Sequence, residues 1–214
     1  MKSRQAEGSR AYGFERDAMG TRFRIVLFTS EGSEAARSAA EAAFELILEL
    51  ERKASDWREE SELSQASRAL EHDGEVEVSS HLADLFALCL EMRERSGGSF
   101  DPAIGAATRL WRRAARQGEE PSQKDLERLR KSGACPWELE GTRLYLPPAS
   151  RRTASSATAG TTIRFDLGAV AKGAALDLAL AELERRGIRS ALVEGGGDLV
   201  CGDAPPGSEG WQIE

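Results

Sequence analysis

The sequence contains few of the residues and motifs that define the common functional classes. Its three cysteines, Cys89, Cys135 and Cys201, lie far apart, so they provide neither a disulfide framework nor a C-x-x-C zinc pair. The two histidines, His72 and His81, lie in a polar loop and at an expected helix start, where solvated roles suit both. The patterns H-E-x-x-H, G-x-S-x-G and G-x-x-x-x-G-K-[ST] are absent, which excludes the enzyme classes that they mark.

Long apolar stretches are also missing. The longest apolar run, Leu85–Leu90, is far too short to cross a bilayer, so no membrane span is expected. The N-terminal segment MKSRQAEGSRAYGFERD has no apolar core and does not fit a signal peptide. We therefore expect a cytoplasmic protein, and an exported form stays open if an upstream segment precedes this sequence.

The charge balance is acidic. The 29 Lys and Arg residues against 36 Asp and Glu residues give a formal net charge of −7 and a pI near 5.2. This balance argues against a nucleic-acid partner, whose recognition usually needs a basic face. An anionic substrate would have to be held locally, by a few cations, backbone N–H groups or a metal ion.

The residue pattern predicts a soluble α+β protein with a mixed or antiparallel sheet and several covering helices. The 214 residues and 40% hydrophobic content suffice for a buried core. Residues 1–17 are polar and expected to be flexible, and one domain is expected over residues 18–214. In the first two thirds, strands are predicted at Thr21–Phe28, Val76–Val78 and Thr142–Leu146, and helices at Glu34–Arg52, after Ser61, from Ser80 to Gly97, after Pro102 and over Ser122–Arg130.

The last third has a βαβ-like order. After a Ser/Thr/Ala-rich loop at Ser150–Thr162, a strand IRFDL is expected, then a helix from about Ala169 to Arg186. Strands SALVE and LVCG follow, joined by GGGD, and a last strand is expected from Trp211. Because the chain stops inside that expected strand, we expect a shortened domain.

The segment DLGAVAKG is the first candidate for ligand binding. It places Asp166 at the end of the expected strand, Gly168 in the turn and Lys172 in the first turns of the helix. The first amides of a helix have no intrahelical partners, so with Lys172 nearby they form a potential anion site. An ordinary strand–helix turn with a solvated lysine fits the same residues.

Other segments also allow both a structural and a functional interpretation. Asp101, before Pro102, either caps a helix or places Ser99 and Phe100 against a ligand. The GGGD segment fits a tight turn better than a phosphate cradle, because no helix follows it. Met19 fits the core or a ligand contact, and Trp57 fits surface packing or stacking on a planar ligand.

Taken together and in this order, these segments resemble the ApbE family of flavin transferases. The matching segments are AMGTRFRIVLF, SDWREESELSQAS, SGGSFDPAIGAATRLW and FDLGAVAKGAALDLALAELERRGIRSALVEGGGD, followed by a Trp-led segment. The resemblance covers nearly the whole chain from about Ala18. It implies an ApbE-like fold and a Mg²⁺-dependent enzyme that moves FMN from FAD to a threonine hydroxyl of an acceptor protein and releases AMP.

The resemblance also implies roles for particular residues. It implies FAD contacts by Met19, Trp57, Ser99, Phe100, Asp101, Asp166 and Lys172. Ala169 matches a metal-ligand position, where it would offer its carbonyl oxygen to Mg²⁺. No catalytic base is assigned.

The chain departs from the family pattern at several positions. Ser67, Ala106, Arg109 and Ala174 replace residues typical of the family, and the family's later metal-binding segment is not in this sequence. Two alternatives therefore accompany the transferase prediction. One is an FAD-binding module of the same family without transferase activity, and the other is an unrelated α/β enzyme that binds a nucleotide at the helix start after Asp166.

Overall fold

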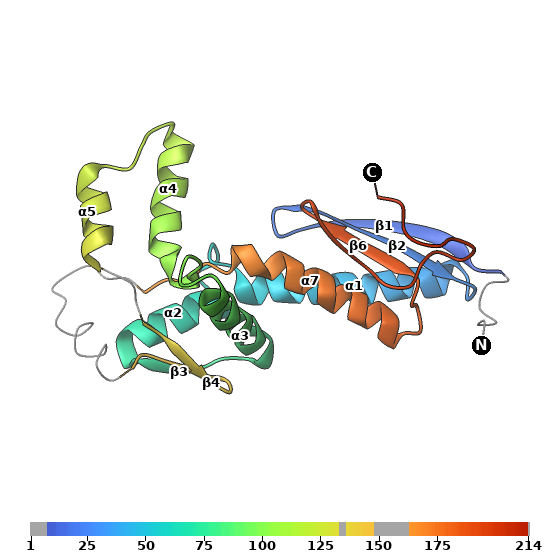
Figure 1. The fold of residues 1–214 in the computed structure, drawn as a ribbon, viewed down its shortest axis with the longest axis horizontal. Helices are drawn as coiled ribbons and strands as arrows, with labels where there is room; N and C mark the ends of the chain where they lie inside the picture. The colour runs from blue at the N-terminus through green and yellow to red at the C-terminus, as the bar shows by residue number, and fades with distance from the viewer. Residues whose placement is uncertain (1–7, 133–135, 148–162, 214) are drawn as a thin grey trace. The chain divides into compact units, whose positions relative to one another are not determined.

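The computed structural model describes residues 8–132, 136–147 and 163–213 (Figure 1). The chain divides into two compact units. The first, here the sheet unit, comprises Met1–Glu51 and Ala171–Glu214, and the second, the helical unit, comprises Arg52–Val170. The loop predicted at Ser150–Thr162 lies outside the described residues.

The sheet unit is built on a four-stranded sheet. Its strands are β1 (Arg10–Ala18), β2 (Thr21–Thr29), β6 (Ala191–Gly195) and β7 (Asp198–Cys201). They lie in the order β1-β2-β6-β7, and each pair of neighbours is antiparallel. Most of α1 (Ser33–Ala54) and of α7 (Gly168–Arg185) belongs to this unit, and Figure 1 shows both helices alongside the sheet.

The first hairpin corrects the expectation of a flexible N-terminus up to residue 17. Residues Arg10–Ala18 form β1 and pair with β2 in continuous register. Met19 and Gly20 form the two-residue turn with φ values of 50° and 73°, the backbone that a tight hairpin requires. The polar segment is ordered because β2 supplies its hydrogen-bond partners, which local composition does not reveal.

One face of the sheet packs against the helices. Phe23, Ile25 and Leu27 of β2 are fully buried. Alanines dominate the buried positions of α1 and recur on α7, and such small side chains let a helix approach a sheet closely. On β1, Arg16 lies over the Phe44 ring of α1, with its guanidinium 5.1 Å from the ring centroid, and pairs with Glu45 at 3.0 Å. The predicted strand at 21–28 and helix at 34–52 are confirmed.

The helical unit combines helices with a small antiparallel sheet. Its helices are α2 (Glu62–Asp73), α3 (Ser80–Arg95), the short η1 (Pro102–Ile104), α4 (Gly105–Gln117) and α5 (Gln123–Ser132). Its strands are β3 (Glu75–Glu77), β4 (Glu138–Glu140) and β5 (Arg143–Tyr145), in the order β3-β5-β4. Ser61 caps α2 as predicted, because its side chain accepts a hydrogen bond from the Ser64 amide.

Three aromatic rings form the centre of the helical unit. Phe86, Trp137 and Phe165 are each at most 2% exposed, and their ring centroids lie 4.9 to 5.5 Å apart. The tilted and edge-on arrangements are those that aromatic pairs favour. Phe165 therefore anchors the segment before α7 in the core of this unit.

Two predicted strands are absent from the described structure. The segment IRFDL pairs with no described strand. Instead, the Asp166 amide donates to Pro102 O at 2.8 Å, and the Gly105 amide donates to Arg164 O at 3.0 Å. Residues 211–213 also form no strand. There the Trp211 ring contacts Phe28, and its Nε1–H donates to Asp203 O at 3.0 Å. In both segments the described hydrogen bonds go to helix-start, loop or side-chain groups and not to a neighbouring strand, so the strand-like composition does not produce a strand.

The predicted α+β class with an antiparallel sheet is confirmed. The βαβ-like order of the last third produces no parallel pair among the described strands, since β6 pairs antiparallel with both β2 and β7. Within the described ranges, no helix combines the length and the apolar character needed to cross a membrane.

Candidate functional site

Asp166 occupies the helix start that the sequence marked as an anion site. Its Oδ1 accepts a hydrogen bond from the Gly168 amide at 2.9 Å, which caps the first turn of α7. One amide of the expected anion site is therefore already bound to an anionic side chain. The remaining oxygen, Oδ2, accepts from Arg112 Nη2 at 2.8 Å.

Arg112 joins Asp166 to a second carboxylate. Its Nη1 donates to Asp56 Oδ2 at 2.5 Å, while its Nη2 contacts Asp166. The two carboxylate side chains are only 12% and 10% exposed. Two carboxylates removed this far from water need a counter-charge, and one planar guanidinium supplies it to both.

Trp57 packs against Arg112 and is partly exposed to solvent. Trp57 is 52% exposed, and the guanidinium carbons of Arg112 and Arg116 lie 4.8 and 4.5 Å from the centroid of its ring. Arg109 braces the adjacent loop by donating to Asp56 O at 2.7 Å. In this structure the ring stacks on guanidinium groups, so part of its surface is covered by the chain itself. The Arg112 cluster is defined here as Asp56, Trp57, Arg112, Arg116 and Asp166.

The segment Ser99–Asp101 follows the end of α3 and directly precedes Pro102, whose carbonyl oxygen accepts the Asp166 amide. Asp101 Oδ1 accepts from the Ala103 amide at 2.9 Å, which is the capping role that the sequence allowed, and Oδ2 lies 3.6 Å from Arg93. Ser99 is exposed and Phe100 is half-buried. Burial, together with the nearby charge of Asp101, raises the pKa of the Cys89 thiol to about 12, so this thiol is not a nucleophile near neutral pH.

Met19 and Lys172 lie at one end of the sheet unit. The register that pairs Phe23 with Gly195 places the Met19 turn and the GGGD turn at the same end of the sheet. Lys172 Nζ is 3.8 Å from Asp198 Oδ2. A Cβ at Gly196 would lie 3.2 Å from Lys172 Nζ, and φ is +64° there, so the glycine turn makes room for the lysine. Met19 is half-buried, between the two environments that the sequence allowed.

The described residues do not form a magnesium site. No group of three or more His, Cys, Asp or Glu that could hold a metal occurs among them. Ala169 is exposed in the first turn of α7, where only its carbonyl oxygen could serve as a ligand. Both oxygens of Asp166, the nearest carboxylate in sequence, already have hydrogen-bond donors. Mg²⁺ prefers six oxygen ligands that include carboxylates, and this set does not supply them.

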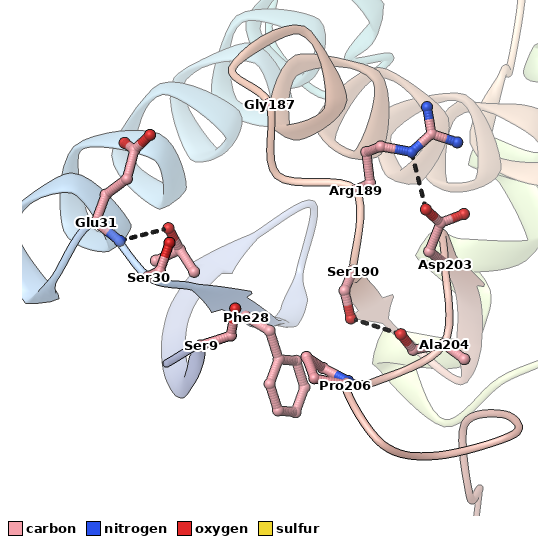
Figure 2. Close-up of a pocket in the computed structure, with 11 residues that line it drawn as sticks. Ser9, Phe28, Ser30, Glu31, Gly187, Arg189, Ser190, Asp203, Ala204 and Pro206 are labelled. Carbon is pink, nitrogen blue, oxygen red and sulfur yellow. Dashed lines mark hydrogen bonds and ion pairs between the residues drawn. The ribbon is translucent and has the colours of Figure 1, made fainter. Parts of the chain in front are cut away.

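A pocket at the other end of the sheet contains none of the predicted site residues (Figure 2). Hydrogen bonds and ion pairs join polar groups within it or next to it. Arg189 pairs with Asp203 at 2.8 Å, Ser190 Oγ donates to Ala204 O at 3.0 Å, and the Glu31 amide donates to Thr29 Oγ1 at 3.1 Å. Among the described lining residues Arg189 is the only Lys or Arg, and its guanidinium is already paired with a carboxylate, which leaves little positive charge for an anionic dinucleotide.

The structure thus sorts the predicted residues into groups. Within the helical unit, Trp57 and Asp166 meet in the Arg112 cluster, and Ser99–Asp101 leads into Pro102, whose carbonyl oxygen accepts the Asp166 amide. Within the sheet unit, Met19 and Lys172 share one end. Arg112 itself was not predicted. The available signal was the four-residue spacing of Arg112 and Arg116, which places both on one helix face within reach of one partner.

Relatives of known class match most of the chain. It is 34% identical over 161 residues to the FAD:protein FMN transferase of Rhodobacter capsulatus, covering 74% of this chain and 29% of that protein. It is 30% identical over 196 residues to the FAD:protein FMN transferase of Treponema pallidum, covering 90% and 52% respectively. The chain therefore spans about half the length, or less, of these curated relatives.

Solved structures share the fold. The flavin transferase ApbE from Vibrio cholerae matches with a TM-score of 0.79 at 21% identity, covering 96% of this chain and 63% of that one. The flavinyl transferase ApbE of Pseudomonas stutzeri in its apo form matches with a TM-score of 0.79 at 22% identity, covering 100% and 67%. The expected ApbE-like fold is confirmed. Residues 19–214 match the ApbE family, and the chain belongs to that family.

Proposed function

We propose that residues 18–214 carry an FAD:protein FMN transferase domain, which moves FMN from FAD to a threonine hydroxyl of an acceptor protein. The observation that carries the proposal is the family match over residues 19–214, together with relatives named for this reaction. The threonine oxygen would bond to the FMN phosphorus as the bond from that phosphorus to the bridging oxygen breaks. AMP leaves with the bridging oxygen, and the hydroxyl proton passes to a base that stays unassigned.

The proposed FAD contacts are those implied by the family resemblance. They are Met19, Trp57, Ser99, Phe100, Asp101, Asp166 and Lys172. Lys172 suits the pyrophosphate best, because its ammonium is partly exposed and its ion pair with Asp198 is long, at 3.8 Å. A cation held this loosely can exchange its partner for a phosphate at little cost. Trp57 suits a planar ring, since half of its surface is open to solvent.

The proposal includes Mg²⁺, which would neutralise the pyrophosphate charge of FAD when bound. Ala169 is proposed to contribute its carbonyl oxygen. Because the described residues do not complete a site for this ion, no step of the transfer is assigned to it.

A second candidate is an FAD-binding module of the family without transferase activity. It is favoured by the absence of an acidic metal-binding group from the described residues and by the engagement of both Asp166 oxygens. Under this candidate FAD binds to the chain and stays intact.

One assay separates the two candidates. The protein is mixed with FAD, Mg²⁺ and a threonine-bearing acceptor protein, and the acceptor is weighed by mass spectrometry while AMP is quantified. A gain of one FMN on the acceptor with an equal amount of AMP supports the transferase. Bound but uncleaved FAD supports the binding module, and no binding at all rejects both.

Lys172→Ala tests the phosphate contact within the same assay. We expect FAD affinity to fall about tenfold, the effect of one lost charge-assisted hydrogen bond. Lys124→Ala on α5 removes the same charge from an exposed helix and serves as the control. Equal affinity of the two variants would remove Lys172 from the site.

A further inference from the structure

We propose that Arg112 is a positioning residue that fixes Asp166 and Trp57 in the arrangement that receives FAD. The identification of the ligand as FAD rests on the proposed function. Neither Arg112 nor Asp56 was among the residues implied by the family resemblance.

The first argument is the shape of the guanidinium group. Its two ends reach different carboxylates, Asp56 at 2.5 Å and Asp166 at 2.8 Å, while its carbon lies 4.8 Å from the Trp57 ring centroid. A planar fork can bond two acceptors in fixed directions and still stack on an aromatic face. A lysine ammonium is a point charge on a flexible stem, so it would hold one of these partners well but not all three.

The second argument is the separation of the joined segments. Asp56 lies in the loop after α1, Arg112 in α4 and Asp166 in the segment before α7, and the two ion pairs span 56 and 54 residues of sequence. Backbone hydrogen bonds tie Asp166 to Pro102, but among the described contacts Arg112 is the link between Asp166 and the Trp57 loop. The Arg112 side chain therefore holds the Asp56–Trp57 loop and Asp166 together.

The third argument is the effect on α7. Asp166 uses Oδ2 for Arg112 and Oδ1 for the Gly168 amide. With Oδ2 released, the carboxylate is free to rotate about its side-chain bonds and the cap on Gly168 weakens. Loss of Arg112 should therefore disturb both the helix start and the Trp57 ring.

The test compares Arg112→Gln and Arg112→Lys with Arg113→Gln. Arg113 is the neighbouring residue on α4, is exposed, and loses the same charge on substitution. FAD affinity is measured by quenching of flavin fluorescence. We expect Arg112→Gln to weaken binding about tenfold or more, Arg112→Lys to recover part of that loss, and Arg113→Gln to stay within about twofold.

A second readout needs no ligand. Hydrogen exchange at the Gly168 amide, followed by NMR, should accelerate in Arg112→Gln and stay unchanged in Arg113→Gln. If the parent protein fails to bind FAD, the proposed function falls, while Gly168 exchange still decides the positioning role. Asp56→Asn, which weakens the anchor of Arg112 without removing the arginine, serves if Arg112→Gln does not fold, and should shift both readouts in the same direction.

Several outcomes would overturn the proposal. Unchanged Gly168 exchange in Arg112→Gln would show that Arg112 does not hold Asp166. Equal losses of FAD affinity in the Arg112 and Arg113 variants would indicate a general effect of helix charge. Failure of Arg112→Lys to recover any affinity, when it folds as the parent does, would also count against a role through the two carboxylates.

Discussion

In the sheet unit Lys172 lies beside a glycine turn with a distant ionic partner, whereas in the helical unit Asp166 is fixed by a close ion pair in addition to its backbone hydrogen bonds. Lys172 lies beside the Gly196 turn, and its ion pair with Asp198 is long, at 3.8 Å. Asp166 makes a cap of 2.9 Å and an ion pair of 2.8 Å. A site built from backbone shape is sensitive to added atoms, and a site built from ion pairs is sensitive to removed ones. The following experiments test that difference.

The largest expected effect is loss of the aromatic centre of the helical unit. Phe165, the residue before Asp166, has a ring that contacts both Phe86 and Trp137, and Phe165→Ala removes this ring. We expect the free energy of unfolding to fall by about 3–5 kcal/mol in denaturant titrations. Ile104→Ala, at a 52% exposed side chain of the same unit, should cost about 0.5 kcal/mol or less. Similar costs for both variants would show that the rings are not the core.

The second effect tests the sheet unit with an added methyl group. In Gly195→Ala the new Cβ would lie 2.6 Å from two carbons of the buried Phe23 ring, which must then move. We expect destabilisation of about 1–3 kcal/mol. Gly13→Ala on β1 is the matched control, because nothing lies within 4 Å of its Cβ position. If Gly195→Ala is as stable as Gly13→Ala, the sheet end is less tightly packed than described.

The third effect uses the described cysteine of each unit as a probe. Cys201 is exposed on β7, whereas Cys89 is buried on α3 and its pKa is raised to about 12. At pH 8 we expect a thiol reagent to modify Cys201 rapidly and Cys89 only when the helical unit opens. Peptide mass mapping over time gives both rates. Arg112→Gln should speed the modification of Cys89 and leave that of Cys201 unchanged, and the reverse result would contradict the side-chain bracing of the helical unit.

The smallest effect concerns a local ion-pair group on α7. Hydrogen bonds from Arg185 and Arg186 lower the pKa of Glu182 from 4.5 to about 2. The folded state thus favours the carboxylate, so this contribution is present above pH 4.5 and is lost as the pH falls towards 2. Glu182→Gln should reduce the loss of stability across that window by about 0.5 kcal/mol. Glu41→Gln, on exposed α1 surface, should leave the pH profile unchanged.

Much of the fold was predictable because its signals are local. The helix over Ser33–Ala54 follows from its apolar spacing, and the start of α2 follows from the cap at Ser61. The strand β1 was missed because its partner, not its composition, orders it. The segment IRFDL was expected to be a strand, but its hydrogen bonds go to the η1 region some 60 residues earlier, and no local pattern encodes that choice.

The candidate site shows the same division. Trp57 and Asp166 were predicted to contact FAD from the order and spacing of motifs, since each lies in a segment that resembles the family. Arg112 was not identified, because a charged residue in a run such as RLWRRAAR is usually solvated. Its partners lie 56 and 54 residues away and come within hydrogen-bond reach only in the folded chain.

The sequence by itself determined the α+β class, the positions of most helices, and the membership of the family. The signals for these, namely apolar periodicity, helix caps, glycine turns and the order of motifs, are local features of the sequence. Only the tertiary structure decided which carboxylates share a guanidinium, where the segment before α7 finds its hydrogen bonds, and which glycine makes room for Lys172. The physical reason is that these outcomes depend on contacts a few ångströms long between residues far apart in sequence, and such contacts are set by packing of the whole unit.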